Sequence, residues 1–371
     1  YIFYPQLLKI LAAGKKANCH VYQRTDDLPN VTILIPAYNE ETVIGEKLES
    51  IFNSDYSTEK IEVFVGSDSS TDKTNEIVKS FQSRFSNLQL VEFPGRIGKA
   101  SIVNQLVTIS KNEILILTDA NIIFSSETIY ELLKHFCNRE IVLVDTHMKH
   151  KSMRKEGISF QEQMYIQTEV EIKRNEGLIW GTMMGPFGGC FALRKDFYTN
   201  VPPSFLVDDF FITLKALEKG GKSINEYNAI VYEDISNDLW EEFKRKIRIA
   251  TGNWQNLFTF FHLLFRFNGL SFSFFSHKVL RWLTPLFLIT AFILSFPLTK
   301  VNDIYYWILF FELGIVALPL LDSILKTSNI HIFIFRLATH FFAMNLALLI
   351  GLFCFIKGVK SGIWNPTRRN Q

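Results

Sequence analysis

The sequence predicts an α/β domain with a mostly parallel sheet, followed by C-terminal helices that cross a membrane. Strand-like and helix-like patterns alternate from Val31 to Lys219. Charged residues are scarce further along the chain, because Leu283–Ile356 carries only six of them. Phe is concentrated in the same region, since 19 of the 35 Phe lie between Gln255 and Ile356. This composition excludes a purely soluble protein, a disordered chain and a fibrous repeat.

Short apolar runs rich in β-branched residues predict the strands. Near-continuous apolar strands that alternate with helices are typical of a parallel sheet covered on both faces. The predicted strands are Val31–Pro36, Ile61–Val65, Leu88–Phe93, Glu113–Leu117 and Ile141–Val144.

Helical patterns fill the intervals between these strands, with apolar residues three and four positions apart. Ser126 is expected to cap the fourth helix. A later helix is expected to open at Val207–Phe210 and to run to Lys219, where two glycines stop it. The first four helices are predicted over Glu40–Phe52, Asp72–Phe81, Lys99–Ile109 and Glu127–Phe136.

Three segments are apolar enough to cross a bilayer, which needs about 20 residues of helix. The Phe-rich segment Leu257–Phe275 contains His262 and Arg266, so we expect an amphipathic helix in the membrane interface, with a fourth span as the alternative. Tyr1–Ala13 is too short to span and is either the end of a longer membrane helix or a short anchor. The predicted spans are Leu283–Thr299, Ile304–Leu321 and Leu337–Ile356.

These patterns divide the chain into five parts. Residues 1–29 are the end of a membrane segment and a linker, 30–240 an α/β domain, 241–278 interfacial helices, 279–356 three transmembrane helices and 357–371 a basic tail. The many Lys and Arg of the α/β domain place it in the cytosol, at an inner or plasma membrane. Three spans would put the basic tail outside, against the same rule. Either Leu257–Phe275 spans, or one segment is re-entrant, or the rule fails here.

Net charge and cysteine content exclude several classes of protein. The formal net charge is only +2 at pH 7, which does not indicate a nucleic-acid binder. The four Cys are scattered and form no CxxC pair, so neither a disulfide framework nor a zinc site is expected. A domain facing the reducing cytosol fits this pattern.

Polar turns follow four consecutive predicted strands. Ligands of parallel sheets bind beyond the carboxyl ends of the strands, so these turns are the candidate site. Any one of them could simply cap a helix or end a strand, but four together predict a pocket. The turns are Pro36–Glu40, Gly66–Asp72, Gly95–Lys99 and Thr118–Asn121.

The residue types in these turns suit a nucleotide with a diphosphate. Asp68 could bond a base or ribose, Tyr38 could pack against a ring, and the two cations Arg96 and Lys99 could neutralise a pyrophosphate. Carboxylate and amide oxygens could hold a divalent cation, as Mg²⁺ prefers when phosphates complete its shell. Those oxygens belong to Asp119 and Asn121.

Two other nucleotide-binding motifs are excluded by spacing. Gly95 lies three residues before Gly98, whereas a P-loop requires five. The first strand is not followed by the GxGxxG fingerprint, so a dinucleotide oxidoreductase is not expected.

Over Thr32–Leu257 the motifs together resemble those of the family 2 glycosyltransferases with a GT-A fold, in the membrane-bound branch of cellulose, hyaluronan and poly-N-acetylglucosamine synthases. The matching segments, in family order, are Val31–Glu40, Ser67–Thr74, Arg96–Lys99 with Asn104, Thr118–Asn121, Gly185–Lys195, Val207–Phe210 and Arg245–Arg248.

The resemblance implies a role for each matching residue. Asp209 would be the general base, with Asp208 beside it, and Asp119 and Asn121 would hold Mg²⁺ or Mn²⁺. Gly188, Gly189 and Cys190 would line the acceptor site. The donor-binding residues would be Ala37, Tyr38, Glu40, Asp68, Arg96, Lys99, Asp119, Arg245 and Arg248. Without the family, the Asp208–Asp209 pair would be read as dipole partners of a helix start and Arg245–Arg248 as a lipid-facing basic surface.

The sequence also departs from the family pattern. Asn121 replaces the usual second Asp of the metal motif, which lowers the expected metal affinity. The motif Gln-x-x-Arg-Trp has Arg245 and Ile249 at its ends, and the nearest Trp is Trp254. In processive synthases that Trp stacks on the acceptor, so its displacement weakens the case for a processive polymerase.

The resemblance implies an inverting, metal-dependent hexosyltransferase with a nucleotide-sugar donor, most simply UDP-linked. Its acceptor would be a membrane-associated glycan in polysaccharide synthesis. Transfer of a single sugar to a lipid is the alternative, and a non-catalytic nucleotide-sugar sensor is an alternative of another class. Lipid bilayer, donor and acceptor are the expected partners, and nucleic acid is not.

Overall fold

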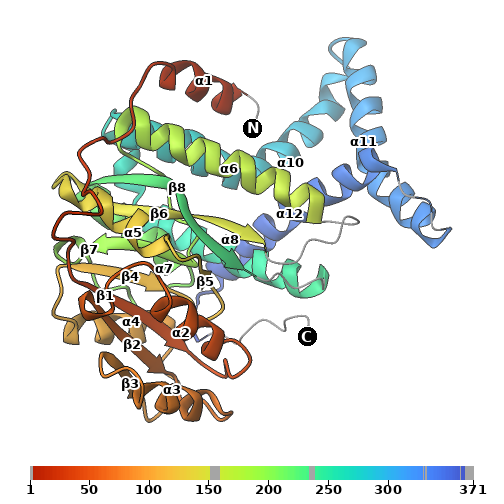
Figure 1. Cartoon of the computed structure of the whole chain (residues 1–371). Helices are drawn as coiled ribbons and strands as arrows, with labels where there is room; N and C mark the ends of the chain where they lie inside the picture. Colours follow the sequence, from red (N-terminus) through yellow and green to blue (C-terminus); the bar gives the residue numbers. More distant parts are fainter. Residues whose placement is uncertain are drawn as a thin grey trace.

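A computed structural model describes residues 3–150, 159–233, 239–328, 330, 332–359 and 361–363. Its centre is one mixed sheet with the strand order β3-β2-β1-β4-β7-β6-β8-β5 (Figure 1). The strands are β1 Val31–Ala37, β2 Ile61–Ser67, β3 Leu88–Glu92, β4 Ile114–Thr118, β5 Ile123–Phe124, β6 Ile141–His150, β7 Cys190–Arg194 and β8 Lys222–Glu233.

The first four predicted strands are confirmed to within two residues, and they are parallel as predicted. The fifth, β6, continues to His150, six residues beyond its predicted end. The second half of the sheet is not uniformly parallel. Strand β7 is antiparallel to both of its neighbours, β4 and β6, and β5 is antiparallel to β8. The sheet is therefore mixed. The predicted turns follow the strands of its parallel half, β1 to β4.

The predicted helices of the α/β domain are present, and Lys99–Ile109 has the predicted bounds. The expected cap at Ser126 is wrong, because the N-cap position of α5 is occupied by Glu127 and no side chain caps that helix. The α-helices are α1 Phe3–Ala12, α2 Ile44–Phe52, α3 Thr74–Gln82, α4 Lys99–Ile109, α5 Thr128–Leu133, α6 Ser159–Trp180, α7 Asp208–Glu218, α8 Leu239–Thr259, α9 Gly269–Ser273, α10 Leu280–Leu298, α11 Ile304–Thr327 and α12 Phe333–Ile356.

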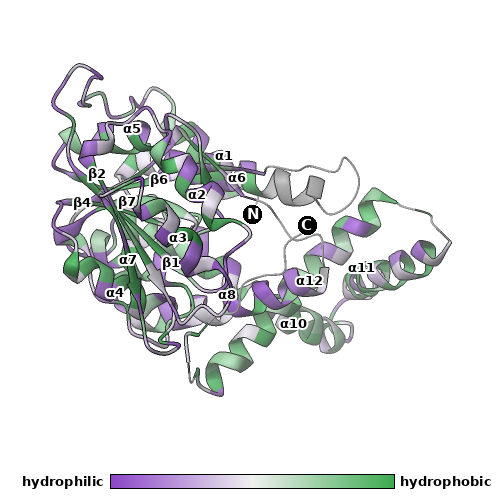
Figure 2. Ribbon diagram, turned by 60° about the horizontal axis from the view of Figure 1, so that its bottom comes forward, coloured by the Kyte–Doolittle hydropathy of each residue, from purple (hydrophilic) through white to green (hydrophobic). Residues whose placement is uncertain are grey.

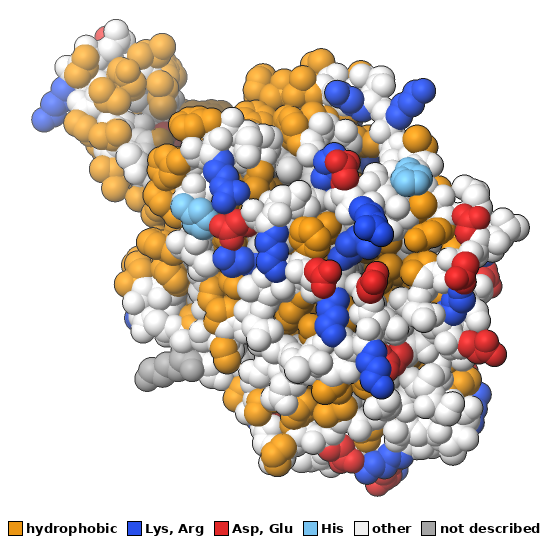
Figure 3. Space-filling model, turned by 90° about the vertical axis from the view of Figure 1, so that its left-hand side faces the viewer, with side chains coloured by type: hydrophobic (Ala, Val, Ile, Leu, Met, Phe, Trp, Pro, Cys, Tyr) orange, Lys and Arg blue, Asp and Glu red, His pale blue; other side chains and the backbone are white. Residues whose placement is uncertain are grey.

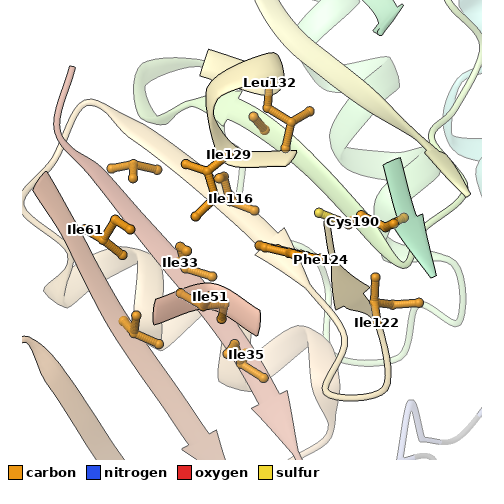
Figure 4. Packing of buried hydrophobic residues seen from close by; sticks show 14 of the residues in the cluster. Ile33, Ile35, Ile51, Ile61, Ile116, Ile122, Phe124, Ile129, Leu132 and Cys190 are labelled. Carbon is orange, nitrogen blue, oxygen red and sulfur yellow. The ribbon is translucent and has the colours of Figure 1, made fainter. Parts of the chain in front are cut away.

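Side chains that alternate along each strand build a core on each face of the sheet. Ile33 and Ile35 of β1 pack with Leu48 and Ile51 of α2 on one face (Figure 4). Leu34, between them, joins the second cluster on the other face, with residues of α4, α7 and α8. Because both of their faces are buried, β1 and β4 are almost entirely apolar, and polar residues concentrate in the turns that follow them.

Three helices are long and apolar enough to cross a membrane, by length and composition: Gly269–Leu298, Ile304–Thr327 and Phe333–Ile356. The first is longer than predicted, because the π-helix Phe274–Val279 joins α9 to α10 without a break. These helices project from the α/β domain and are strongly hydrophobic (Figures 1 and 2). On the face in Figure 3, by contrast, charged side chains of both signs intermingle on the domain.

The single amphipathic helix predicted over Leu257–Phe275 is wrong. Helix α8 ends at Thr259, and a 3₁₀ turn, Phe261–Phe265, follows it. Phe267 then adopts a positive φ of 49°. The next residue, Asn268, starts α9, because its side chain accepts a hydrogen bond from the Ser271 amide. The predicted helix is therefore broken into separate pieces.

The end of α12 returns to the α/β domain. Gly351 packs so closely on α8 that an added Cβ would lie 2.5 Å from the Ala250 side chain. Further on, the Gly362 backbone lies against Gly98 and against the carbonyl oxygen of Pro203. Lys360, Arg368 and Arg369 of the predicted basic tail lie outside the described residues.

A buried charged cluster ties α6 to the start of the first apolar helix. His277 places its Nε2 2.9 Å from Glu169 and its Nδ1 2.9 Å from Glu176, and Tyr4 of α1 donates to the same Glu176. A cavity of about 290 Å³ lies beside this cluster, between α1, α6 and α10. None of the predicted site residues lines that cavity.

Candidate active site

The turns after β1, β2 and β4 meet at one edge of the sheet. β1 and β2 pair in parallel up to Ala37 and Ser67, and the Asp68 amide donates to the Ala37 carbonyl at 2.8 Å. The predicted convergence of these turns therefore holds in the structure. Ala37 is fully buried at the end of β1, and its carbonyl is occupied by the Asp68 amide, so this residue is not exposed to a ligand in the structure.

Asp68 organises the turn that follows β3. Its carboxylate is fully buried and accepts hydrogen bonds from the Arg96 side chain at 3.0 Å and from the Ile97 amide at 2.7 Å. The Arg96 guanidinium lies 3.3 Å from the centre of the Tyr38 ring. Tyr38, Asp68 and Arg96 thus form one contiguous wall that leads to Gly98 and to the start of α4.

Lys99, the first residue of α4, lies between two carboxylates. Its Nζ is 2.8 Å from Asp119 Oδ1 and 3.7 Å from Asp208 Oδ2. Burial alone would lower the Lys99 pKa, but Asp119 and Asp208 outweigh that effect and raise it. Lys99 is therefore a permanent cation in this cleft. A small cavity beside it is lined by Pro36, Thr118, Asp119, Gly188 and Asp208, among others.

Asp209 lies in the first turn of α7, and its carboxylate contacts Gly188, which lines the same cavity. Burial and the neighbouring Asp208 raise its pKa to about 6, against the opposing effect of Lys99. A carboxylate with this pKa is ionised at neutral pH and is also a stronger base than an ordinary aspartate. The first turn of a helix would normally favour a carboxylate, so the raised pKa reflects burial and the crowding of negative charge.

Gly188 lies directly against this carboxylate. Its φ is +79°, and a Cβ added there would be 2.6 Å from Asp209 Oδ2. Only glycine leaves room for the carboxylate in this position. The neighbouring Gly189 accepts hydrogen bonds through its carbonyl from the Asp119 amide and the Thr118 hydroxyl. The glycine segment is thereby bonded to the turn that carries Asp119.

We predict that Gly188→Ala reduces activity about 100-fold, because it displaces the Asp209 carboxylate. Gly220→Ala is the matched control, since Gly220 also has a positive φ, of 89°, but open space around its Cβ. Both variants should lose similar stability in thermal melts, and only Gly188→Ala should lose activity. Equal activity of the two variants would contradict this placement of Asp209.

The Asp119–Asn121 turn lies beside an acidic residue that the sequence reasoning missed. Asn121 Nδ2 is 3.4 Å from Glu233 Oε1, at the end of β8. Burial raises the pKa of Glu233, with Arg245 opposing and Asp119 adding to the effect. The signal in the sequence was an acid directly after the apolar run Ile230–Tyr232, but the pairing of β8 with β5 was not foreseen.

The described residues hold no group of three His, Cys, Asp or Glu side chains close enough to bind a metal ion unaided. The oxygens of Asp119 and Asn121, with Glu233 beside them, are nevertheless hard ligands of the kind Mg²⁺ and Mn²⁺ prefer. Such a set suits an ion that takes its remaining ligands from the phosphates of a bound nucleotide.

The two arginines of α8 differ in their surroundings. Arg248 is exposed, and Asp208, Asp119 and Asp209 are all close enough to act on its charge. Arg245 instead makes a two-pronged ion pair with Glu242, at 2.8 and 2.9 Å. Arg248 therefore lies near the carboxylates of the cleft, whereas the Arg245 side chain is bound to Glu242.

Two other predicted site residues have buried side chains. Cys190 starts β7 inside the core, where burial raises the pKa of its thiol to about 12 (Figure 4). Cys190 is therefore not exposed to an acceptor in the structure. Glu40 is buried, and its backbone amide donates to the Thr74 hydroxyl at 2.8 Å.

Known proteins resemble this chain in part of its sequence and in its fold. Residues 32–201 match the family model described as Glycosyl transferase family 2, so this part of the chain is similar to that family. No curated protein matches the chain. The match does not separate the branch of cellulose and hyaluronan synthases from others, so that branch stays a prediction.

Two solved structures illustrate the likeness. The mannosyltransferase PcManGT from Pyrobaculum calidifontis, in complex with GDP-Man and Mn²⁺, has a TM-score of 0.73 at 20% identity, covering 96% of this chain and 94% of that chain. S. aureus TarS 1–349 in complex with UDP-GlcNAc has a TM-score of 0.45 at 18% identity, covering 74% and 82%. The likeness to PcManGT shows the fold, and its coverage includes the C-terminal helices. The GT-A fold with appended apolar helices is thus confirmed.

Proposed function

We propose that the protein is an inverting, metal-dependent glycosyltransferase that moves a hexose from a nucleotide-sugar donor to a membrane-associated acceptor. The observation that carries the proposal is the meeting of a basic carboxylate, Asp209, with a diphosphate-binding set in one cleft. That set consists of Lys99, Asp119 and Arg248. A binding-only sensor would have no use for a carboxylate with a raised pKa at this position.

The donor diphosphate would lie between Lys99 and Arg248, with the nucleoside against the wall formed by Tyr38, Asp68 and Arg96. Mg²⁺ or Mn²⁺, held by Asp119 and Asn121 with Glu233 nearby, would neutralise charge on the leaving diphosphate. Lys99 exchanges its contact with Asp119 for the phosphates as the donor enters. Lys99 and Arg248 would then stabilise the negative charge that develops on the leaving diphosphate.

Asp209 would take the proton from the acceptor hydroxyl as that oxygen attacks the anomeric carbon. The bond to the diphosphate breaks on the opposite face of the sugar, so one displacement inverts the configuration. Asp208 would keep Lys99 oriented and keep the pKa of Asp209 raised. The backbone at Gly188, which lines the cavity, would support the acceptor.

We predict that activity rises with pH until the Asp209 carboxyl is fully ionised. Its pKa is about 6, so kcat/KM should fall about tenfold for each unit of pH below that value. Because other ionisable groups lie close to Asp209, the profile reports an apparent pKa. A pH–rate profile from pH 5 to 8 at saturating metal measures it, and a flat profile would contradict the role of Asp209.

The nucleotide is proposed to be uridine diphosphate, by resemblance to the family, although PcManGT binds GDP-Man. Polysaccharide synthesis is the proposed context, and single transfer to a lipid is the second candidate. Trp254 favours that second candidate, because it is buried in the core against α4, α7 and α8 residues and cannot stack on an acceptor. The length of a radiolabelled product distinguishes the two.

The proposed location is a membrane, with the catalytic domain in the cytosol. Both the start of the first apolar helix and the end of α12 lie against this domain. An odd number of complete crossings cannot begin and end on one side, so we propose that one of the three apolar helices is re-entrant. The basic residues near the C-terminus would then also be cytosolic, in agreement with the positive-inside rule.

The full-length protein in detergent micelles, incubated with UDP- and GDP-linked sugars and Mn²⁺, tests the proposed activity. Release of nucleoside diphosphate from one donor, dependent on metal and on an acceptor extract, is the expected result. No release from any nucleotide sugar would contradict the proposal.

A further inference from the structure

Lys47 of α2 lies beside the candidate site and is among the largest fully buried side chains of the described residues. It points from the inner face of α2 to the end of β4 and is completely excluded from solvent. None of its hydrogen-bond partners in the described part of the chain is a carboxylate. Burying an ammonium group in this way is costly, and a Met side chain would fill a similar volume without that cost.

The contacts of Lys47 join the two ends of the Asp119–Asn121 turn. Its Nζ donates to the Thr118 hydroxyl at 2.9 Å, just before the turn, and to the Ile122 carbonyl at 2.5 Å, just after it. The same Nζ lies 3.5 Å from the centre of the Phe124 ring, which adds a cation–π contact. The Lys47 side chain is thus bonded to the residue before the turn and to the residue after it.

A second link connects this turn to the glycine segment. Because the Thr118 hydroxyl accepts from Lys47, its own hydrogen is directed to the Gly189 carbonyl, 3.0 Å away. Gly189 follows Gly188, which lies against the Asp209 carboxylate. Lys47 is therefore bonded, through Thr118, to the segment that also positions the proposed base.

We infer that Lys47 is a positioning residue that clamps the Asp119–Asn121 turn in the geometry needed to bind the divalent metal ion with the donor diphosphate. This inference rests on the proposed function. Partners of metal ligands commonly change metal affinity 10–100-fold when they are removed. The clamp does not depend on the protonation state of Lys47. Burial lowers its pKa to about 7, against the effects of Cys190 and Asp119. Both the amine and the ammonium can donate the two hydrogen bonds.

The test compares Lys47→Met with wild type by calorimetric titration of Mn²⁺ into the full-length protein saturated with UDP or GDP. We expect the Kd for Mn²⁺ to rise at least tenfold, while nucleotide binding in EDTA is unchanged. In assays, the Mn²⁺ concentration for half-maximal rate should rise similarly, and kcat at saturating Mn²⁺ should stay within about threefold. Leu48→Met, a swap of similar volume in the same core, is the control and should bind Mn²⁺ as wild type does.

Two results would overturn the inference: unchanged Mn²⁺ affinity in folded Lys47→Met, or a loss of kcat without a loss of Mn²⁺ affinity. If Lys47→Met does not fold, Thr118→Val provides the second measurement, because it removes the hydroxyl and keeps the β-branched shape. Wild-type Mn²⁺ affinity in Thr118→Val would then reject the clamp. Failure of the proposed function is distinguishable, since wild type itself would then show no metal-dependent nucleotide binding.

Discussion

Asp209→Asn is expected to lower sugar transfer about 10²–10⁴-fold, the usual contribution of a general base. The amide has nearly the shape of the carboxylate but cannot take the proton of the acceptor hydroxyl. Binding of nucleoside diphosphate should be unchanged, because Lys99, Asp119 and Arg248 remain in place. Initial rates and nucleotide titrations of the same preparation measure both effects.

The variant should also be at least as stable as wild type. The Asp209 pKa is raised from 3.8 to about 6 in the folded protein, so ionisation favours the unfolded chain. That cost accumulates as pH rises from about 4 to 6 and is fully present at neutral pH, where Asn removes it. Asp196→Asn is the control, since Asp196 is exposed and follows β7 at the end opposite to Cys190. Full transfer activity of Asp209→Asn would reject the assignment.

Asp119→Ala is expected to remove the metal-dependent part of donor binding and to lower kcat/KM by about 100-fold or more. The same change frees Lys99, whose ammonium lies 2.8 Å from Asp119 in the structure. Nucleotide binding without metal should therefore be retained or become tighter. Titrations with and without EDTA separate these two components.

Asn121→Asp is the matched variant in the opposite direction. It restores the second carboxylate of an Asp-x-Asp pair next to Glu233, which lies 3.4 Å from the Asn121 amide nitrogen. We expect tighter Mn²⁺ binding from the added charge, and a higher apparent pKa of the neighbouring acids.

The Asp119→Ala variant gives the decisive negative result. If its metal dependence equals that of wild type, Asp119 is excluded from the metal site.

The parallel half of the sheet could be predicted because its strands are buried on both faces. Such strands are apolar throughout, and their turns carry the polar residues that function requires. The positions of Asp68, Lys99 and Asp119 followed from this rule, since the carboxyl ends of parallel strands lie at one edge. Asp209 came from the family resemblance alone, because paired acids at a helix start have an ordinary structural explanation.

Features that depend on pairing between distant segments could not be predicted. The antiparallel strand β7 and the short strand β5 have no distinctive periodicity, so the antiparallel pairings within the mostly parallel sheet were not predicted. Glu233 reaches the site only because β8 pairs with β5. Lys47 lies at helical spacing from Ile44 and Ile51, on the apolar face of α2, but its partners Thr118 and Ile122 are distant in the sequence and no local pattern indicates them. The return of α12 to the α/β domain depends on close contacts of Gly351 and Gly362, which no local pattern indicates.

An experimental structure of the full-length protein with Mn²⁺ and a nucleotide sugar tests the central claim most directly. Our account predicts the diphosphate between Lys99 and Arg248, the metal ion on Asp119, and the sugar anomeric carbon facing the Asp209 carboxylate. A nucleotide bound elsewhere, for example in the cavity between α1, α6 and α10, with these side chains free of ligand, would contradict it.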